Sequence, residues 1–225
     1  MGLCYNWIVM IIPNTIVDNF FYYPDKIRDF GLSLSFNKPT NNIYAGMRTD
    51  CLSYINRNLY NNINRKVTSL FFDFKDQPVS YQANVYFQKV SSIYEEGWIH
   101  QDPNDITFIV YLNPKPNLKE GTSIYQLNDI DYDTKTYQSQ KEESFNNTDL
   151  IPQYRNLRKE HNSHYTEILN VPNVYNRLFA FDGFSHHGAN EFKEEGDNTR
   201  LILIGFISNI TRNDTAIRRI QSIGI

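Results

Sequence analysis

Hydrophobic positions in the first third of the chain recur mainly at helical spacing. In residues 24–30 a proline and an aspartate suit a first helical turn, and the pattern predicts a short helix that ends near Gly31. A weaker helical pattern covers residues 52–64. The apolar run at residues 5–12 instead predicts a strand at the start of the chain.

From residue 69 onward the pattern is that of short strands. Runs rich in β-branched and aromatic residues are separated by segments rich in Asp, Asn, Pro and Gly. The predicted strands cover residues 69–74, 83–90, 98–100, 106–112, 122–125, 177–181 and 200–207, and a turn or helix is predicted at 213–221. This organisation predicts a mainly β fold, a double-stranded β-helix of the jelly-roll or cupin-like kind, with flanking N-terminal helices.

A long polar stretch at about 128–162 interrupts the strands. It is rich in Asp, Lys, Gln, Glu and Asn, and its only helical pattern lies within residues 153–169. Loops of this length are uncommon in compact domains and often form lids or binding loops. Since no repeat or linker separates two globular units, we expect residues 1–225 to form a single domain that carries this insert.

Composition narrows the functional classes. Aromatic residues make up 15% of the chain, with 16 Tyr and 15 Phe, which favours strands. A net charge of −3 gives no basic surface, so we expect no nucleic-acid partner. Cys4 and Cys51 are too few for a disulfide scaffold. With no signal-peptide, myristoylation or membrane-helix pattern, we expect a cytoplasmic protein that does not contact membranes.

The most informative motif is His100-Gln101-Asp102. On a strand, residues two apart point to the same face, so both side chains could bind one metal ion. A second histidine from a distant strand would complete a two-histidine, one-carboxylate site, which suits non-haem Fe(II). Taken alone, this pair is more often a turn with a hydrogen-bonded histidine. Gly97 and Pro103 favour the metal site, because they place the pair at the rim of a sheet.

Two features downstream could complete the site. His186 and His187 follow a predicted strand, and since adjacent strand residues face opposite sides, at most one of them should meet the metal. Arg200 begins an apolar strand, and its parity groups it with an inward-facing set, Ile202, Ile204 and Phe206. A buried guanidinium needs an anion, whereas the commoner alternative is a surface arginine at the start of a strand.

Together these motifs resemble the 2-oxoglutarate- and Fe(II)-dependent oxygenase superfamily, near the prolyl-hydroxylase-type enzymes. Segments 17–20, 24–28 and 44–49 resemble a small uncharacterised branch of it. The likeness runs from about residue 17 to 206, without the polar stretch at 128–162. A departure lies at Gly121-Thr122, where the superfamily usually has paired glycines.

The resemblance implies a role for each matching residue. His100, Asp102 and, six residues after Phe181, His187 would be the metal ligands. The residues implied for 2-oxoglutarate binding are Arg200, Tyr111 in the segment Tyr-Leu-Asn, and more loosely Tyr94 in a Tyr-x-x-Gly element.

The implied activity is that of a dioxygenase that uses Fe(II), 2-oxoglutarate and O2. It would hydroxylate a C–H bond of an amino-acid, peptidyl or other small substrate and release succinate and CO2. Two alternatives stay open: a cupin-like metal protein that does not use 2-oxoglutarate, and a catalytically inactive jelly-roll protein with a binding or structural role. No oligomeric state is predicted.

Overall fold

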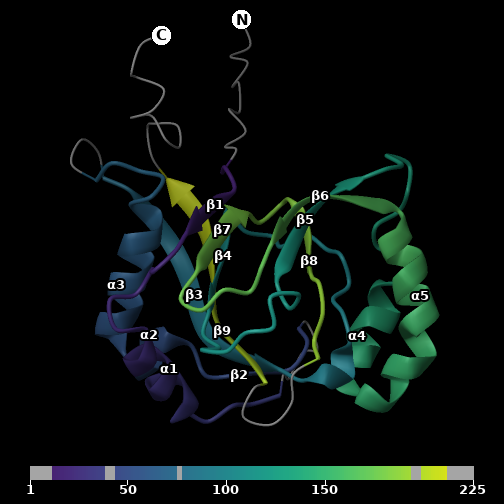
Figure 1. The fold of residues 1–225 in the computed structure, drawn as a ribbon. Helices are drawn as coiled ribbons and strands as arrows, with labels where there is room; N and C mark the ends of the chain where they lie inside the picture. Colours follow the sequence, from purple (N-terminus) through teal and green to yellow (C-terminus); the bar gives the residue numbers. More distant parts are fainter. Residues whose placement is uncertain (1–11, 39–43, 75–77, 194–198, 212–225) are drawn as a thin grey trace, which may run out of the picture.

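Two antiparallel sheets form the centre of the molecule and lie between two groups of helices (Figure 1). The computed structural model describes residues 12–38, 44–74, 78–193 and 199–211. The larger sheet has six strands in the order β1 (Thr15–Val17), β7 (Leu178–Asp182), β4 (Ile106–Tyr111), β9 (Arg200–Thr211), β3 (Ser80–Val90) and β2 (Met47–Arg48). The smaller sheet has the order β6 (Tyr165–Val171), β5 (Thr122–Leu127) and β8 (His186–Ala189). The predicted fold of two antiparallel sheets is confirmed.

The helices cover different sides of these sheets. The predicted N-terminal group consists of α1 (Pro24–Leu32), α2 (Leu52–Ile55) and α3 (Arg57–Thr68), on the left of Figure 1. Its apolar side chains pack against the larger sheet in one buried cluster. On the right lie α4 (Gln138–Asn146) and α5 (Ile151–Ser163). A 3-10 turn, η1 (Ser92–Tyr94), follows β3, and a second one, η2 (Thr148–Leu150), lies between α4 and α5.

The central strands supply two separate apolar layers because successive side chains point to opposite faces. In β4, Phe108 and Val110 pack toward α1–α3, whereas Ile109 and Tyr111 pack toward the smaller sheet. All six residues of β4 are buried, which explains why its sequence is almost continuously apolar. Gly205 of β9 pairs with Phe108, and a side chain there would collide with the Phe108 ring.

The sequence predicts a long loop at 128–162, but this stretch instead contains α4, η2 and α5. The helix predicted within 153–169 starts earlier, at Ile151, with a proline in its first turn, and residues 165–171 form β6 instead. The buried positions of these two helices are largely polar, with Ser144, Arg158 and His161 among them. A hydrophobic pattern could not reveal helices whose inner faces carry such residues.

Three other predictions need correction. The helix expected at 52–64 breaks at Asn56, whose side chain accepts a hydrogen bond from the Leu59 amide and caps α3. Residues 69–74 are not a strand, since α3 continues to Thr68 and the chain then turns with Phe71 and Phe72 buried in the core. Residues 98–100 form only one isolated bridge. Strands β1, β2, β6 and β8 were not predicted.

Two predicted elements cannot be compared. Of the strand expected at 5–12, only Ile12 belongs to the described residues, and the turn or helix at 213–221 lies outside them. Among the helices of the described ranges, none combines the length and apolar character needed to span a membrane.

Candidate metal centre and adjoining cavity

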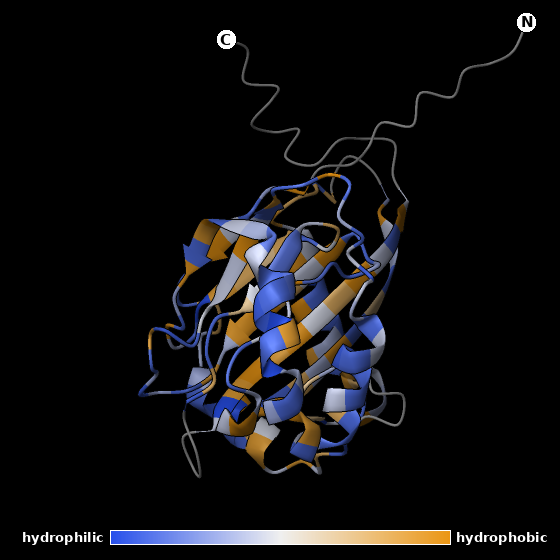
Figure 2. Ribbon diagram, turned by 90° about the vertical axis from the view of Figure 1, so that its right-hand side faces the viewer, coloured by the Kyte–Doolittle hydropathy of each residue, from blue (hydrophilic) through white to orange (hydrophobic). Residues whose placement is uncertain are grey.

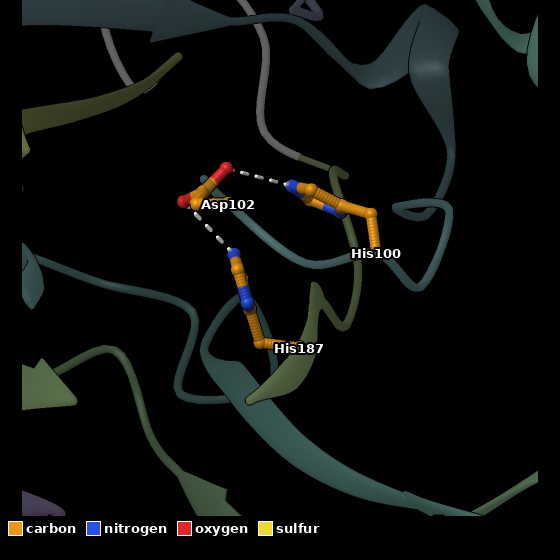
Figure 3. Close-up of side chains that lie close together, drawn as sticks. All are labelled: His100, Asp102 and His187. Carbon is orange, nitrogen blue, oxygen red and sulfur yellow. Dashed lines mark ion pairs between the residues drawn. The ribbon is translucent and has the colours of Figure 1, made fainter. Parts of the chain in front are cut away.

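His100, Asp102 and His187 come together beside the edge strand β8 of the smaller sheet (Figure 3). One potential ligand atom from each of the three side chains lies within 4.8 Å of the others. The Nε2 atom of His100 is 3.7 Å from Oδ1 of Asp102, and Nε2 of His187 is 3.3 Å from Oδ2. The sequence-predicted triad is therefore a cluster in space, although 85 residues separate Asp102 from His187.

Backbone hydrogen bonds place these side chains. His100 and His187 exchange both amide-to-carbonyl bonds, at 2.9 and 2.8 Å, as an isolated antiparallel bridge. The Gly97 amide donates to the carbonyl of Ala189 at 2.8 Å, and a Cβ at Gly97 would lie only 2.8 Å from the Ala189 nitrogen. The segment before His100 thus runs against β8 without forming a regular strand, and glycine allows the close approach.

The hydrogen bonds of both imidazoles leave Nε2 free. Nδ1 of His100 donates to the Trp98 carbonyl and Nδ1 of His187 donates to the Ser185 carbonyl, each at 2.8 Å. A carbonyl can only accept, so each Nδ1 carries a proton, and in the neutral ring the lone pair therefore lies on Nε2. Backbone carbonyls commonly fix the ring orientation of metal-binding histidines in this way.

The carboxylate of Asp102 is also oriented by neighbours. The Thr107 hydroxyl donates to its Oδ2 at 2.8 Å, and Thr107 in turn accepts from the Asn104 amide at 2.9 Å. Burial alone would raise the pKa of Asp102, but His187, His100 and Thr107 hold it well below the usual range. Burial, Lys141 and His187 lower the pKa of His100 well below its usual value.

This donor set fits a divalent cation. In their neutral form both imidazoles present Nε2 lone pairs toward the carboxylate, and lone pairs facing a carboxylate repel unless a proton or cation lies between them. Two histidines and one carboxylate are also the ligand set that binds Fe(II) with open coordination positions. His186 lies elsewhere, with its ring 5.0 Å from that of Tyr165. Its Nε2 is buried and lacks a hydrogen-bond partner within the described part of the chain.

A cavity of about 740 Å³ opens beside the triad between the two sheets. Strands of both sheets line it, and α4 and α5 close it on the remaining side. Figure 2 shows this side, with a largely hydrophilic helix in front of hydrophobic strands. The cavity is large enough for a co-substrate and part of a second molecule.

Arg200 lies in this cavity wall and is buried, with 3% of its surface exposed. Its Nε donates to the Glu120 carbonyl at 3.0 Å, and Nη2 lies 3.4 Å from the Thr122 hydroxyl oxygen. The Tyr111 hydroxyl donates to the same oxygen at 2.9 Å, and its ring centre is 5.7 Å from the guanidinium. Within the described residues, no carboxylate is within ion-pair distance of Arg200. Among the described residues this buried guanidinium therefore has no ion-paired carboxylate, although Glu120 attracts it from a greater distance.

Tyr94 lies further along the same cavity. It packs in a small apolar cluster with Phe192, whose ring is 5.4 Å from the Arg200 guanidinium. No contact recorded for the described residues joins Tyr94 directly to Arg200. The structure thus brings Tyr111 beside Arg200 but places Tyr94 one side chain away.

Helix α5 is tied to the segment that carries His100. His161 and Asn162 bond the backbone of this segment: Nε2 of His161 donates to the Ile99 carbonyl at 2.8 Å, and Asn162 accepts from the Ile99 amide at 3.0 Å. The buried Arg158 donates to the Tyr94 carbonyl at 3.0 Å and to Glu95 at 2.8 Å. The polar inner face of α5 therefore supports the metal-site backbone.

Three cavity residues were not anticipated from the sequence. Arg48 of β2 stacks on the Tyr44 ring, with its guanidinium carbon 3.8 Å from the ring centre, and its Nε donates to Gln88 at 3.0 Å. Lys141 of α4 reaches the same cavity, where burial lowers its pKa to about 8. Thr107 was also missed, although its parity with Ile109 and Tyr111 on a predicted strand could have revealed it.

Comparisons with known proteins agree with this architecture. The model of a family described as "Family of unknown function (DUF6445)" matches residues 12–200. No match was found among curated proteins. HygX from Streptomyces hygroscopicus, solved with nickel and 2-oxoglutarate bound, aligns with a TM-score of 0.51 at 11% identity, over 87% of this chain and 83% of HygX.

A second solved structure is the non-heme α-ketoglutarate-dependent epimerase SnoN from nogalamycin biosynthesis. It aligns with a TM-score of 0.50 at 11% identity, over 86% of this chain and 76% of SnoN. At this identity the two alignments show the fold alone. They confirm the predicted likeness to 2-oxoglutarate-dependent oxygenases at that level.

Proposed function

The chain belongs to the family of unknown function DUF6445, and we propose that it is an Fe(II)- and 2-oxoglutarate-dependent dioxygenase. The reaction would hydroxylate a C–H bond of an amino-acid, peptidyl or other small substrate. One observation carries the proposal: the Nε2 atoms of two histidines and a carboxylate converge beside a cavity that also holds a buried guanidinium with no ion-paired carboxylate among the described residues.

His100, Asp102 and His187 would hold the ferrous ion. The Nδ1 hydrogen bonds to Trp98 and Ser185 keep each Nε2 aimed at the ion, and Thr107 holds the Asp102 carboxylate in place. Bound Fe(II) and 2-oxoglutarate would supply the chemistry, in which O2 and 2-oxoglutarate become succinate and CO2 as the substrate gains a hydroxyl group.

Arg200 would bind the distal carboxylate of 2-oxoglutarate. Its guanidinium offers a fixed fork of donors and stays charged, which suits a buried carboxylate better than lysine would. Tyr111 and Thr122 orient that fork from the adjoining strands. We assign Tyr94 to the same end of the cavity, where it would exclude water together with Phe192.

Three further expectations belong to this proposal. The chain would act as one domain in which 128–162 forms part of the cavity wall. It would work in the cytoplasm, in keeping with its low cysteine content. Its partner would be a small-molecule or peptide substrate rather than nucleic acid, because its net charge is −3.

The test compares two neighbouring histidines. Wild-type protein, His187→Ala and His186→Ala are titrated anaerobically with Fe(II), followed by 2-oxoglutarate, and succinate is then measured after O2 is added. We expect His187→Ala to lose metal binding, and His186→Ala to keep it. The ligand assignment is wrong if the two variants behave the other way round.

The same experiment separates the alternative functions. Metal binding without affinity for 2-oxoglutarate would indicate a cupin-like protein of another class. Absence of metal binding in the wild-type protein would indicate a binding or structural role.

A further inference from the structure

Two cations in the cavity have no role in the function proposed above. Arg48 comes from β2, at the edge of the larger sheet, and Lys141 comes from α4, on the right of Figure 1. Asp102 acts electrostatically on both of them. Within the part of the chain that is described, neither forms an ion pair with a carboxylate. Both therefore lie in the cavity as positive charges that no described carboxylate pairs with directly.

Arg48 is held in one orientation by its surroundings. The ring of Tyr44 lies against the guanidinium at 3.8 Å, and the rings of Phe206 and Tyr86 lie at 5.1 and 5.5 Å. Gln88 accepts a hydrogen bond from Nε and donates to the Ala45 carbonyl at 2.7 Å. Within the described residues, the Nη atoms of Arg48 have no hydrogen-bond partner. The stacked rings thus preorganise a donor fork whose outer edge is available to a ligand.

Charge balance shows what kind of ligand is missing. A divalent metal and Arg200 would balance Asp102 and the two carboxylates of 2-oxoglutarate. The two acidic side chains on the segment before the triad, Glu95 and Glu96, are engaged by Arg158 at 2.8 and 3.2 Å. Among the described residues, Arg48 and Lys141 then remain without an ion-paired carboxylate in the loaded cavity, where Lys141 is attracted only from a distance by Asp102 and Glu142. Uncompensated charge in a partly desolvated site is costly, and an anionic ligand removes that cost.

We propose that the primary substrate carries an oxyanion, a carboxylate or a phosphate, which Arg48 binds through its Nη atoms while Lys141 adds a second positive charge. This inference rests on the proposed function, since it takes the Arg200 end of the cavity as the 2-oxoglutarate site. It makes Arg48 a specificity-determining residue, because a neutral analogue of the substrate would leave the guanidinium unpaired.

The test uses three fluorinated probes that differ only in the end group: 4-fluorophenylacetate, 4-fluorophenyl phosphate and the neutral 4-fluorophenylacetamide. Binding is followed by 19F NMR, with Zn(II) as a redox-inert metal and saturating 2-oxoglutarate to occupy the Arg200 site. We expect Arg48→Gln to weaken binding of at least one anionic probe by about tenfold or more. The amide should bind wild type and variant equally. Comparison of the two anionic probes identifies the preferred oxyanion.

Two variants control for charge and folding. Arg57→Gln removes the same charge from an exposed position on α3, outside the cavity, and should leave all three probes unaffected. Arg48→Lys keeps the charge without the fork and should give intermediate affinity. Lys141→Gln should weaken the anionic probes by less than Arg48→Gln does.

The outcomes separate this inference from the proposed function. Anionic probes that fail to bind the wild-type protein, or that bind Arg48→Gln equally well, overturn the oxyanion site. Loss of 2-oxoglutarate binding in Arg48→Gln would also overturn it, because Arg48 would then serve the co-substrate. If the wild-type protein binds no 2-oxoglutarate while Arg48 still governs the anionic probes, the proposed function fails and the oxyanion site stands.

Discussion

The two faces of the six-stranded sheet are built from the same strands but differ in the side chains that they present. On the face toward α1–α3, Phe87, Phe108 and Leu203 are completely buried among other apolar side chains. On the opposite face, the same strands present Gln88, Thr107 and Arg200 to the cavity. The first face is a packed core, and the second combines an apolar layer with oriented polar groups.

Because of this contrast, neighbouring residues of a single strand contribute either to the stability of the core or to the lining of the cavity. In β9, Leu201 and Leu203 contribute to the core toward the helices, while Arg200 and Ile202 lie on the cavity side. The free-energy cost of burying polar side chains on the cavity side is offset by the burial of apolar surface on the side that faces the helices. We therefore expect substitutions on the two faces to affect different measurements.

The largest effect on stability is expected at Phe108. Phe108→Ala removes a fully buried ring that packs over Gly205, and we expect a loss of about 3–5 kcal/mol in the free energy of unfolding. Denaturant titration measures it. The remaining folded protein should bind metal with unchanged affinity. A parallel loss of metal affinity would mean that the two faces are not independent.

Arg200→Met should produce the converse result. We expect affinity for 2-oxoglutarate to fall by about a hundredfold or more, because a buried charged partner is removed. Unfolding should require as much free energy as in the wild type, or more, since a guanidinium without an ion-paired carboxylate among the described residues is costly to bury. Calorimetric titration and denaturant unfolding measure the two quantities. A destabilised variant with normal co-substrate affinity would assign Arg200 to the core instead.

Thr107→Val should have a smaller effect that is specific to the metal centre. The variant loses the hydroxyl that donates to Asp102, and we expect metal affinity to fall about 10- to 100-fold. Thr107→Ser keeps the hydroxyl and should restore most of the affinity. Competition with a metal chelator measures all three proteins. Equal affinities in Thr107→Val and wild type would show that Asp102 is held by other contacts.

The smallest effect is expected at the end of the larger sheet, where neither face is involved. Arg177 donates to Asp18 at 2.6 and 2.9 Å and lowers the pKa of Asp18, although the carboxylate is half exposed. Asp18→Asn should cost at most about 1 kcal/mol of unfolding free energy at neutral pH.

The pH dependence of this last effect has a definite sign. A carboxyl whose pKa is lowered on folding stabilises the protein above its unfolded value, here 3.8. The difference between wild type and Asp18→Asn should therefore shrink as the pH falls below that value. Chemical unfolding at neutral and acidic pH measures it, and a difference that grows on acidification would contradict the assignment.

The parts of the fold that could be predicted from the sequence are those in which the residues of a single strand reveal whether it is buried and which side chains share a face. The uninterrupted apolar character of β4 and β9 identified both central strands, and parity alone grouped Arg200 with Ile202 and Ile204. By contrast, β8 consists of His-His-Gly-Ala and has no strand pattern, because its pairing with β5 and with His100 depends on distant residues.

Cavity charges were harder to foresee. Arg48 lies on a two-residue strand, and Lys141 lies on a helix of polar sequence, so neither stands out from surface residues. Their significance depends on which carboxylates are near them in space. The sequence around each residue does not show which carboxylates lie near it in the folded protein.

The hydrogen bonds between α5 and residues 97–99 limit how this fold could diverge or be redesigned. Asn162 bonds both Gly97 and Ile99, so the helix works as a brace for the chain that leads into His100. A shortened descendant lacking 128–162 would lose that brace along with the cavity wall. Replacing the sequence of α4 alone would change the cavity wall, and with it the choice of substrate, while keeping the hydrogen bonds that α5 makes to residues 97–99.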